Sequence, residues 1–478
     1  MMAKQRNPKL DLALQCIASG QAKDAATICE SALKENKKDD LAMAMLAQAK
    51  NALGLHEEAI QHITAAIIRN SKRADYHGLF GDLLTTKGEF RKAIAAYDKA
   101  LKLNPNHHGV IAGKANTWLR LNESKKAIDL LAPLVKRGNE DLTISIVYAR
   151  ALIEHGESFA ATELLLEKLP ATKEPNETRR TMYFTLGKAM EQAGEYKSSF
   201  EAYSEGNKLS TSGFDLEKCK HAHDDIISVF SSNCSKKTST STISGSNLIF
   251  IVGMLRSGST LTEQIIDAHP KGRGLGELNT LPTLIQNNLD NGPLSSVWSK
   301  LNCEQLTSIA QQYLDLIPKC SEEKLVDKQL GNFMFVGAIK QLFPQAKIIH
   351  CTRNPISMGL SCFAQKLPPN TNPWASSLED IGNFYIEYAR LMNHWHSLYN
   401  DILEVSYESL VLNQDEKTQE ILEYCGLDFD ERCLRFWETG RTVLTLSQDQ
   451  VRKPMYADSV KRHEKFGDLL APLQQIVL

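Results

Sequence analysis

Small residues recur along the first 207 residues with a period of 34, and this is the clearest pattern in the chain. The repeated position holds Gly20, Gly54, Gly88 and Gly156, with Asn122 where the series lacks a glycine. Five residues after each of them stands an alanine: Ala25, Ala59, Ala93, Ala127 and Ala161. Glycine and asparagine suit the left-handed turn at a helix end, and alanine lets two helices pack closely. The pattern predicts stacked helical hairpins.

One repeat holds the fullest set of these positions, namely Gly81, Gly88, Ala93, Tyr97, Ala100 and Pro105. In period and residue type it resembles the tetratricopeptide repeat. A sixth hairpin, with Gly187, Gly194 and Tyr203, follows a longer loop at 170–175. We therefore expect an array of about six hairpins over residues 6–207. The resemblance implies a concave surface that binds a protein or peptide, and the alternative is a scaffold or a platform for a dimer.

Polar residues dominate the junction that follows, for which we expect a helix and a linker over residues 208–246. Residues 231–246, SSNCSKKTSTSTISGS, can bury little apolar surface and predict a linker or an exposed loop. The helix before them carries His221 and His223, followed by two aspartates. We interpret these four residues as a solvated polar face, with a metal site as the alternative.

At residue 247 the hydrophobic pattern changes. Residues 247–253 form a nearly continuous apolar run, typical of a strand buried on both faces of a parallel sheet. A loop and a helical stretch, 261–269, follow. This order gathers free backbone N–H groups and the positive end of a helix dipole around one point. It predicts a phosphate site made by Arg256, Ser257, Gly258, Ser259 and Thr260.

The same loop comes close to a Walker A motif, which is the signature of nucleoside triphosphatases. Gly253 and Gly258 have the required spacing, but Ser259 stands where the motif has its lysine. That lysine contacts the β- and γ-phosphates, so its absence disfavours a triphosphatase. A kinase-like enzyme with Asp327 as its magnesium ligand stays an alternative.

The segment IFIVGMLRSGSTLTEQIIDAHP resembles the 5'-phosphosulfate loop of sulfotransferases, above all of tyrosylprotein sulfotransferases and bacterial tetratricopeptide sulfotransferases. It departs from the usual PRSGTT form at Leu255 and Ser259. The strand at 346–353 resembles the family's second motif, in which Arg353 and Ser361 bind the 3'-phosphate. The resemblance implies that 3'-phosphoadenosine 5'-phosphosulfate (PAPS) is the co-substrate and that no metal is needed.

Two further residues match the catalytic positions of this family. Glu277 follows Arg256 by 21 residues, and Lys328 precedes Arg353 by 25, as in tyrosylprotein sulfotransferases. The resemblance implies that Glu277 is the catalytic base and that Lys328 stabilises the leaving group. A solvated carboxylate and a surface lysine are the alternatives.

The last part of the chain contains the remaining candidates. Tyr407 ends a predicted strand and resembles a tyrosine near the nucleotide, with a buried core tyrosine as the alternative. Residues 447–456, SQDQVRKPMY, resemble a nucleotide-covering loop. There the resemblance implies that Ser447 contacts the reacting sulfate, and that Lys453 and Arg462 close the donor site. A solvated basic tail is the alternative for the two basic residues. We expect packing or surface roles for His394 and His396.

Composition limits the remaining possibilities. The net charge of −2 gives no basic excess for a nucleic-acid partner. The ten cysteines have no CxxC spacing, which favours reduced thiols and a cytoplasmic location. No apolar stretch reaches the ~18 residues that span a bilayer, and the start of the chain lacks the apolar core of a secretion signal.

Together these patterns predict an all-α tetratricopeptide superhelix followed by an α/β, P-loop-like sulfotransferase domain at 247–478, with a mainly parallel sheet. The predicted function is transfer of a sulfuryl group from PAPS to an acceptor hydroxyl, on a protein or peptide. The alternatives are an adaptor with a non-catalytic nucleotide-binding domain and the kinase-like enzyme. Acceptor pockets consist of variable loops, so the sequence leaves the acceptor open.

Overall fold

A computed structural model describes residues 8–138, 141–171, 177–231, 239–289, 293–320, 322–438, 455 and 460–478. The chain divides into two compact units, Met1–Ala202 and Tyr203–Leu478, and each is described by itself. No helix of these described residues is both long enough and apolar enough to cross a membrane. The domain boundaries expected at residues 207 and 246 remain predictions.

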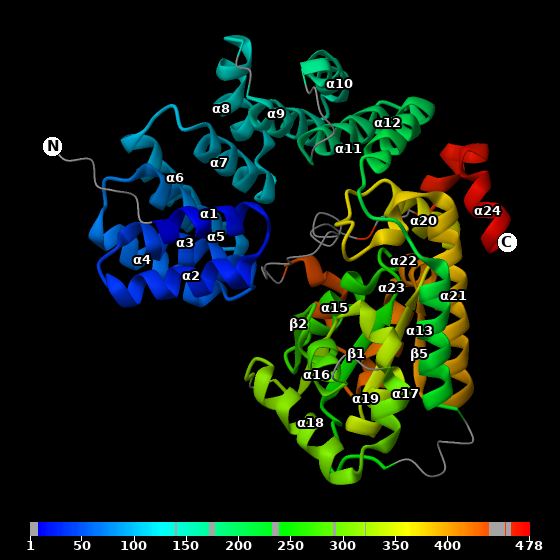
Figure 1. The fold of residues 1–478 in the computed structure, drawn as a ribbon. Helices are drawn as coiled ribbons and strands as arrows, with labels where there is room; N and C mark the ends of the chain where they lie inside the picture. The colour runs from blue at the N-terminus through cyan, green and yellow to red at the C-terminus, as the bar shows by residue number, and fades with distance from the viewer. Residues whose placement is uncertain are drawn as a thin grey trace. The chain divides into compact units, whose positions relative to one another are not determined.

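The first unit consists of paired antiparallel helices, coloured from blue to green in Figure 1. The pairs are α1 (Pro8–Ala18) with α2 (Ala22–Glu35), α3 (Asp40–Ala52) with α4 (His56–Arg69), α5 (Ala74–Thr86) with α6 (Phe90–Leu103), α7 (His108–Arg120) with α8 (Ser124–Lys136), α9 (Leu142–His155) with α10 (Ser158–Lys168), and α11 (Glu177–Gln192) with α12 (Tyr196–Lys208). The last of these helices crosses the division between the units. The predicted all-α array of hairpins is confirmed.

The turns between paired helices explain the spacing of the repeat. Each predicted turn position has a left-handed backbone, with φ of 77° at Gly20, 79° at Gly54, 82° at Gly88, 58° at Asn122 and 90° at Gly156. Most side chains clash in this conformation, whereas glycine and asparagine tolerate it. Asparagine at the fourth turn, where the other turns have glycine, therefore preserves the fold.

The helix contacts explain the small residues. The five alanines that follow the turns are fully buried. A Cβ atom on Gly81 would lie 2.6 Å from the ring of Tyr97, so only glycine leaves room for that ring. Tyr97 is itself buried, and its hydroxyl donates a hydrogen bond to Asp82 Oδ1 at 2.7 Å.

The second unit is built on a sheet of five parallel strands in the order β2-β3-β1-β4-β5. The strands are β1 (Leu248–Gly253), β2 (Gly272–Gly276), β3 (Lys324–Asp327), β4 (Lys347–Thr352) and β5 (Ile402–Ser406). All six residues of β1 are buried, as its apolar run predicts. The α/β class with a parallel sheet is confirmed.

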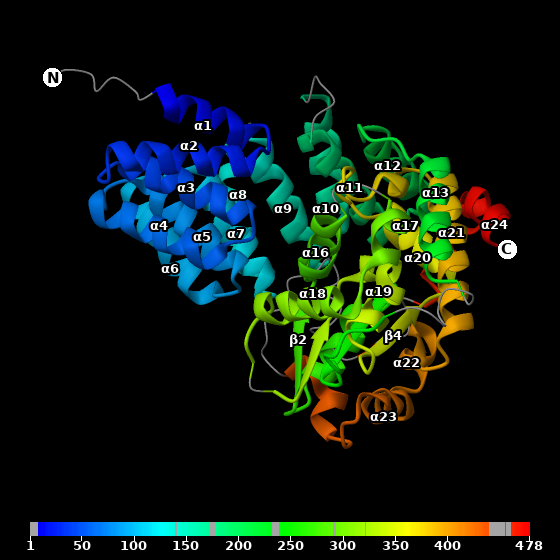
Figure 2. The ribbon, with the colours of Figure 1, turned by 60° about the horizontal axis from the view of Figure 1, so that its bottom comes forward.

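Helices cover both faces of this sheet (Figure 2). On one face, Ile249 and Ile251 belong to a core that includes residues of α15 (Ser259–Asp267) and α23 (Gln414–Cys425). On the other face, Phe250 packs against Tyr313 of α18 (Cys303–Leu316) and against Phe343, which follows α19 (Val336–Leu342). The other α-helices of this unit are α13 (Leu216–Val229), α16 (Thr280–Asn288), α17 (Leu294–Val297), α20 (Pro355–Phe363), α21 (Leu378–Leu398), α22 (Tyr407–Leu412) and α24 (Ala471–Val477).

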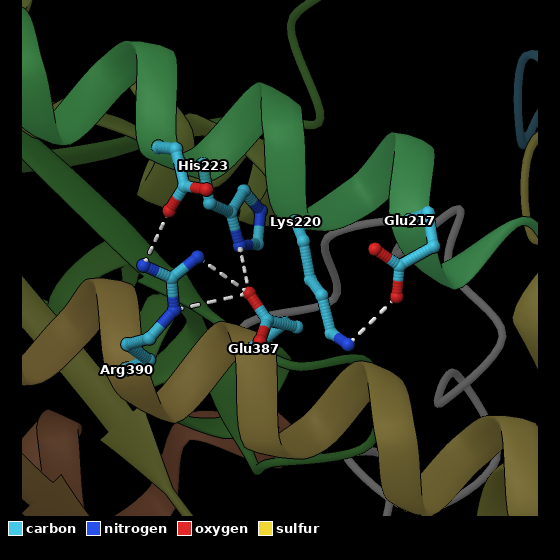
Figure 3. A network of polar contacts seen from close by, with 6 residues as sticks. Glu217, Lys220, His223, Glu387 and Arg390 are labelled. Atoms are coloured by element: carbon cyan, nitrogen blue, oxygen red, sulfur yellow. Dashed lines mark hydrogen bonds and ion pairs between the residues drawn. The ribbon is translucent and has the colours of Figure 1, made fainter.

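Polar contacts join α13 to α21 (Figure 3). His223 is 2% exposed and lies 3.7 Å from Glu387 Oε2. Arg390 pairs with both Glu387, at 2.7 Å, and Asp224, at 2.8 Å. The interpretation of this helix as a solvated polar face is therefore wrong for His223, which lies between the two helices.

The end of the polar junction also packs against the second unit. Ser241 is buried, and its backbone N–H donates to Gln341 O at 2.8 Å. The Thr242 N–H donates to Thr307 Oγ1 at 3.0 Å. Residues 239–246 thus form a loop that hydrogen bonds anchor to this unit, with Thr240, Thr242, Ser244 and Ser246 exposed.

Candidate functional site

Each of the five strands is followed by a predicted site residue, either directly or in the loop after the strand. Glu277 follows β2, Lys328 follows β3, Arg353 follows β4 and Tyr407 follows β5, while Arg256 lies in the loop after β1. Because the strands are parallel, these ends share one edge of the sheet. The connection after β1 leads to one side of the sheet order and the connection after β4 leads to the other, so the strand order reverses between these two strands. Ligands of such sheets bind at that switch point.

The loop between β1 and α15 has an unusual backbone. Gly253, Arg256 and Gly258 have φ of 152°, 70° and 94°. A positive φ is strained for arginine, and such strain is concentrated at functional sites. The loop delivers the chain to the N-terminus of α15, where Ser259 and Thr260 are buried.

Both glycines of this loop are required by close neighbours. A Cβ on Gly253 would lie 2.6 Å from Cys351 O, and one on Gly258 would lie 2.7 Å from Tyr407 Cδ2. Ser257 is buried, and among the described residues its Oγ has no hydrogen-bond partner. A phosphate oxygen at this loop could supply one.

Hydrogen bonds join the two predicted phosphate motifs. Arg256 Nε donates to Ser361 Oγ on α20 at 3.0 Å. Arg353 Nη1 donates to the carbonyl oxygen of Arg256 at 3.1 Å. The first loop and the second motif are therefore in direct contact.

Three arginines gather at this site. Desolvation lowers the pKa of Arg256, and the nearby positive charges of Arg353 and Arg462 lower it further. The pKa of Arg353 is also lowered, chiefly by desolvation and additionally by Arg462. Like charges repel, so this grouping favours a multiply charged anion.

Tyr407 supports two parts of the site. The Arg353 guanidinium carbon lies 4.5 Å from the centre of the Tyr407 ring, as in a cation–π contact. The ring also lies beside Gly258 of the loop, where a Cβ atom would be 2.7 Å from Tyr407 Cδ2. Tyr407 thus lies at the site, partly exposed, and also packs against the core of this unit.

A contact that the sequence analysis missed holds the segment around Arg462. His463 Nδ1 lies 2.7 Å from Ser357 Oγ, and the same hydroxyl donates to Val460 O at 3.1 Å. Ser357 lies four residues before Ser361 on α20, so one helix carries both contacts. The only signal in the sequence was the position of His463 directly after Arg462.

The proposed catalytic pair is in direct contact. Lys328 Nζ lies 2.5 Å from Glu277 Oε1. The lysine side chain is fully buried, whereas that of the glutamate is 48% exposed. The surface-lysine alternative for Lys328 is therefore wrong.

Buried carboxylates hold the backbone on both sides of this pair. Glu263 accepts a hydrogen bond from the Gly276 N–H at 2.8 Å, directly before Glu277. Asp327, directly before Lys328, accepts from the Tyr313 hydroxyl at 2.9 Å and from the Gln329 N–H at 3.0 Å. Burial raises the pKa of Asp327 to about 7. Its oxygens are thus engaged in the core, which argues against the role of magnesium ligand.

The structure brings together the predicted residues that it describes in two groups. The first group surrounds the loop after β1, and its members are Arg256, Ser257, Gly258, Ser259, Thr260, Arg353, Ser361, Tyr407 and Arg462. The second is the pair formed by Glu277 and Lys328. Ser447 and Lys453 lie outside the described residues, so their roles remain predictions.

Comparisons with known proteins agree with these two parts of the chain. Residues 248–431 match the model of the sulfotransferase family. Residues 17–83 and 84–143 match a tetratricopeptide repeat model. An uncharacterized protein of Aquifex aeolicus (strain VF5) is 30% identical over 420 residues, which are 84% of this chain and 54% of that protein.

Protein-tyrosine sulfotransferases match a smaller part of the chain. The protein-tyrosine sulfotransferase of Drosophila melanogaster is 26% identical, over 45% of this chain and 46% of its own length. A putative protein-tyrosine sulfotransferase of Caenorhabditis briggsae is 24% identical, over 45% of this chain and 77% of its own. The chain thus spans about half the length of the Aquifex and Drosophila relatives. Residues 248–431 are thus similar to the sulfotransferase family, and the residues that precede them in the chain are similar to tetratricopeptide repeats.

Proposed function

We propose that this protein transfers a sulfuryl group from PAPS to an acceptor hydroxyl on a protein or peptide. One observation carries the proposal: a cluster of arginines and a lysine–glutamate pair lie along the shared edge of the parallel sheet. The match of this domain to the sulfotransferase family supports it.

The described residues fit the two charged ends of PAPS. The N-terminus of α15 with residues 256–260 offers backbone and hydroxyl donors for the 5'-phosphosulfate. Arg353 and Ser361 offer a guanidinium and a hydroxyl for the 3'-phosphate, and Arg462 adds charge nearby. Tyr407 holds Arg353 against the loop.

PAPS supplies the sulfuryl group. In the transfer, the bond from sulfur to the bridging phosphate oxygen breaks and a bond from sulfur to the acceptor oxygen forms. Glu277 takes the proton of the acceptor hydroxyl. Lys328 stabilises the negative charge that develops on the bridging oxygen. Since the two side chains now contact each other, Lys328 must exchange Glu277 for the donor during turnover.

The acceptor is proposed from two observations. Relatives of this domain are named protein-tyrosine sulfotransferases, which suggests a hydroxyl carried by a polypeptide. Stacked hairpins commonly bind peptides or proteins, so we propose that the array binds this acceptor. The nine cysteines of the described residues are free thiols, which supports the proposal of a cytoplasmic location.

The two rival functions make different predictions. A kinase-like enzyme needs a lysine where Ser259 stands and a metal ligand such as Asp327, whose oxygens bond to Tyr313 and Gln329. An adaptor would bind peptide but would show no activity that depends on Glu277.

Calorimetry with 3'-phosphoadenosine 5'-phosphate, the product nucleotide, tests the donor site. We expect wild type to bind it, adenosine 5'-monophosphate to bind at least 10-fold more weakly, and Arg256→Ala to lose most of the affinity. Absence of binding in wild type would refute the proposal.

Transfer of radioactive sulfate from labelled PAPS to a tyrosine-containing peptide library then tests the acceptor. Turnover of ATP with Mg²⁺ instead would favour the kinase-like rival.

A further inference from the structure

Two histidines and a glutamate, none of them part of the site described above, meet on one face of the sheet. His350 lies on β4 and Glu404 is its register partner on β5, so both side chains project from the same face. His396 comes from α21. His350 Nδ1 lies 3.0 Å from His396 Nε2, and Glu404 Oε2 lies 4.0 Å and 3.8 Å from these two nitrogens.

The three distances have the size of a metal coordination triangle. A point equidistant from the three atoms lies about 2.1 Å from each, which is the usual bond length of zinc to histidine nitrogen or carboxylate oxygen. Tetrahedral ligands at that bond length are about 3.4 Å apart. Glu404 is 57% exposed, so its carboxylate can make the small movement toward the rings that this spacing requires.

Neighbouring groups already orient the three side chains. The Tyr388 hydroxyl lies 2.5 Å from His350 Nε2, the ring nitrogen that faces away from the cluster. Thr352 Oγ1 donates to the second oxygen of Glu404 at 3.4 Å. Histidine ligands of metals usually have such a partner on the other nitrogen, because it fixes the ring and its tautomer.

We propose that His350, His396 and Glu404 bind a divalent cation of the zinc type, with water as the fourth ligand. Two imidazoles and one carboxylate are a common ligand set for Zn²⁺. The ligands come from three elements, so the cation ties α21 to β4 and β5. His350 lies on β4, the strand that Arg353 directly follows. The cation therefore stiffens the strand that presents this arginine. The proposal is independent of the transferase activity, for which we expect no metal.

The alternative is a cluster held by hydrogen bonds alone. The contact between the two ring nitrogens can be an N–H···N bond between neutral imidazoles, with the carboxylate near His396. The two states differ in one measurable respect, which is tight and stoichiometric binding of metal.

Metal binding by the tag-free full-length chain separates these states. The chain is dialysed against EDTA and titrated with Zn²⁺ by calorimetry, and retained zinc is measured by mass spectrometry after gel filtration. We expect one zinc per chain in wild type. His396→Ala removes a ligand whose side chain is 30% exposed, and we expect at least 100-fold weaker binding. Replacement of Zn²⁺ by Co²⁺ should give the intense visible absorption of a four-coordinate site.

Three variants complete the test. Glu404→Gln keeps the shape of an exposed side chain but removes its charge, and we expect 10- to 100-fold weaker binding. Tyr388→Phe removes the partner of His350, for which we expect a loss of about 10-fold. His221→Ala, an exposed histidine on α13, should bind as wild type does. The proposal is wrong if wild type binds no zinc. It is also wrong if His396→Ala and Glu404→Gln bind zinc as tightly as wild type does while their circular dichroism is unchanged.

Discussion

Arg256 Nε donates a hydrogen bond to Ser361 Oγ at 3.0 Å, across 105 residues of sequence. The bond joins the loop after β1 to α20, and the Arg353 bond to the Arg256 carbonyl oxygen joins the same loop to the end of β4. Groups proposed for the two ends of one nucleotide therefore support each other. A change in one should disturb binding at both.

Substitution of Arg256 tests this joint arrangement. Arg256→Ala removes a charge and the bond to Ser361, and Arg256→Lys keeps only the charge. A hydrogen bond to a charged group contributes roughly 1.5–3 kcal/mol, so we expect Arg256→Ala to bind 3'-phosphoadenosine 5'-phosphate on the order of 100-fold more weakly. Arg256→Lys should recover only a small part of that loss, because lysine lacks the planar fork of donors.

The control for this measurement is Arg432→Ala. Arg432 is 60% exposed and pairs with Asp430 at 2.7 Å. Its removal changes the net charge by the same amount, but we expect an affinity within 2-fold of wild type. Equal affinities for Arg256→Ala and Arg432→Ala would contradict the assignment of Arg256.

Variants of Glu277 and Lys328 separate catalysis from donor binding. Glu277→Gln removes the base, for which we expect kcat to fall by about 10²–10⁴-fold. Lys328→Met removes the charge that stabilises the leaving oxygen, and we expect a fall of about 10²–10³-fold. Both variants should bind the product nucleotide within about 10-fold of wild type, because the arginine cluster is intact.

Thermal unfolding distinguishes a damaged site from a damaged fold. Glu277→Gln leaves the fully buried Lys328 ammonium without its carboxylate, so we expect a lower Tm. Lys328→Met leaves a glutamate that is half in water and should cost less. The double variant should regain the Tm lost by Glu277→Gln without regaining activity. Recovery of activity in the double variant would rule out the proposed roles.

Much of this site could be predicted because strand and loop patterns are local. The apolar run of β1 and the glycines after it indicate a strand, a turn and a helix start without further information. The 34-residue period gave the turn at Asn122 in the same way. In a parallel sheet, residues at strand ends come together whatever their separation in sequence. Glu277 and Lys328 are an example: they are 51 residues apart in sequence, but Lys328 Nζ lies 2.5 Å from Glu277 Oε1.

The rest depends on contacts that no local pattern encodes. The bond of His463 to Ser357 joins residues 106 apart and involves neither a motif nor a repeat. His223 has the surroundings of a solvated residue in sequence, but the packing of α13 on α21 buries it against Glu387. The partner of Asp327 is Tyr313 on α18, which the order of strands alone does not place.

Asp327 should make the stability of the second unit depend on pH. Burial raises its pKa to about 7, while its hydrogen bonds to Tyr313 and Gln329 offset part of that rise. Between about pH 4 and 7 the folded chain keeps a proton that the unfolded chain releases. Stability therefore falls as pH rises through this window, and the loss is complete above pH 7.

Asp327→Asn removes this dependence, because asparagine has the same shape and does not ionise. We expect the variant to gain about 1–4 kcal/mol relative to wild type between pH 5 and pH 8. The measurement is the difference in unfolding free energy between the two proteins, in urea at each pH. A difference that is the same at both pH values would show that Asp327 does not titrate in this range.

Gly258 and Tyr407 should be energetically coupled. Gly258→Ala places a Cβ atom 2.7 Å from Tyr407 Cδ2 and imposes φ of 94° on alanine. We expect a loss of about 1–3 kcal/mol in stability and weaker nucleotide binding. Tyr407→Ala removes the clash but also the ring beneath Arg353, so it weakens nucleotide binding by itself.

A double-mutant cycle measures this coupling. In the Tyr407→Ala background, Gly258→Ala should cost less than in wild type, because only the backbone strain remains. Gly331→Ala is the control, since its new Cβ atom meets nothing within 4 Å. Strictly additive losses would indicate that the ring does not limit residue 258.

Asn122 offers a test of the repeat in the first unit. Its φ of 58° is left-handed, and alanine pays about 1 kcal/mol more than asparagine or glycine there. Asn122→Ala should therefore lower the temperature at which the helical array unfolds, and Asn122→Gly should leave it unchanged or raise it. Lys125→Ala, on the exposed face of α8, controls for loss of a side chain. Circular dichroism at the helix signal measures all three, and an Asn122→Ala variant as stable as Asn122→Gly would show that the backbone of this turn does not limit stability.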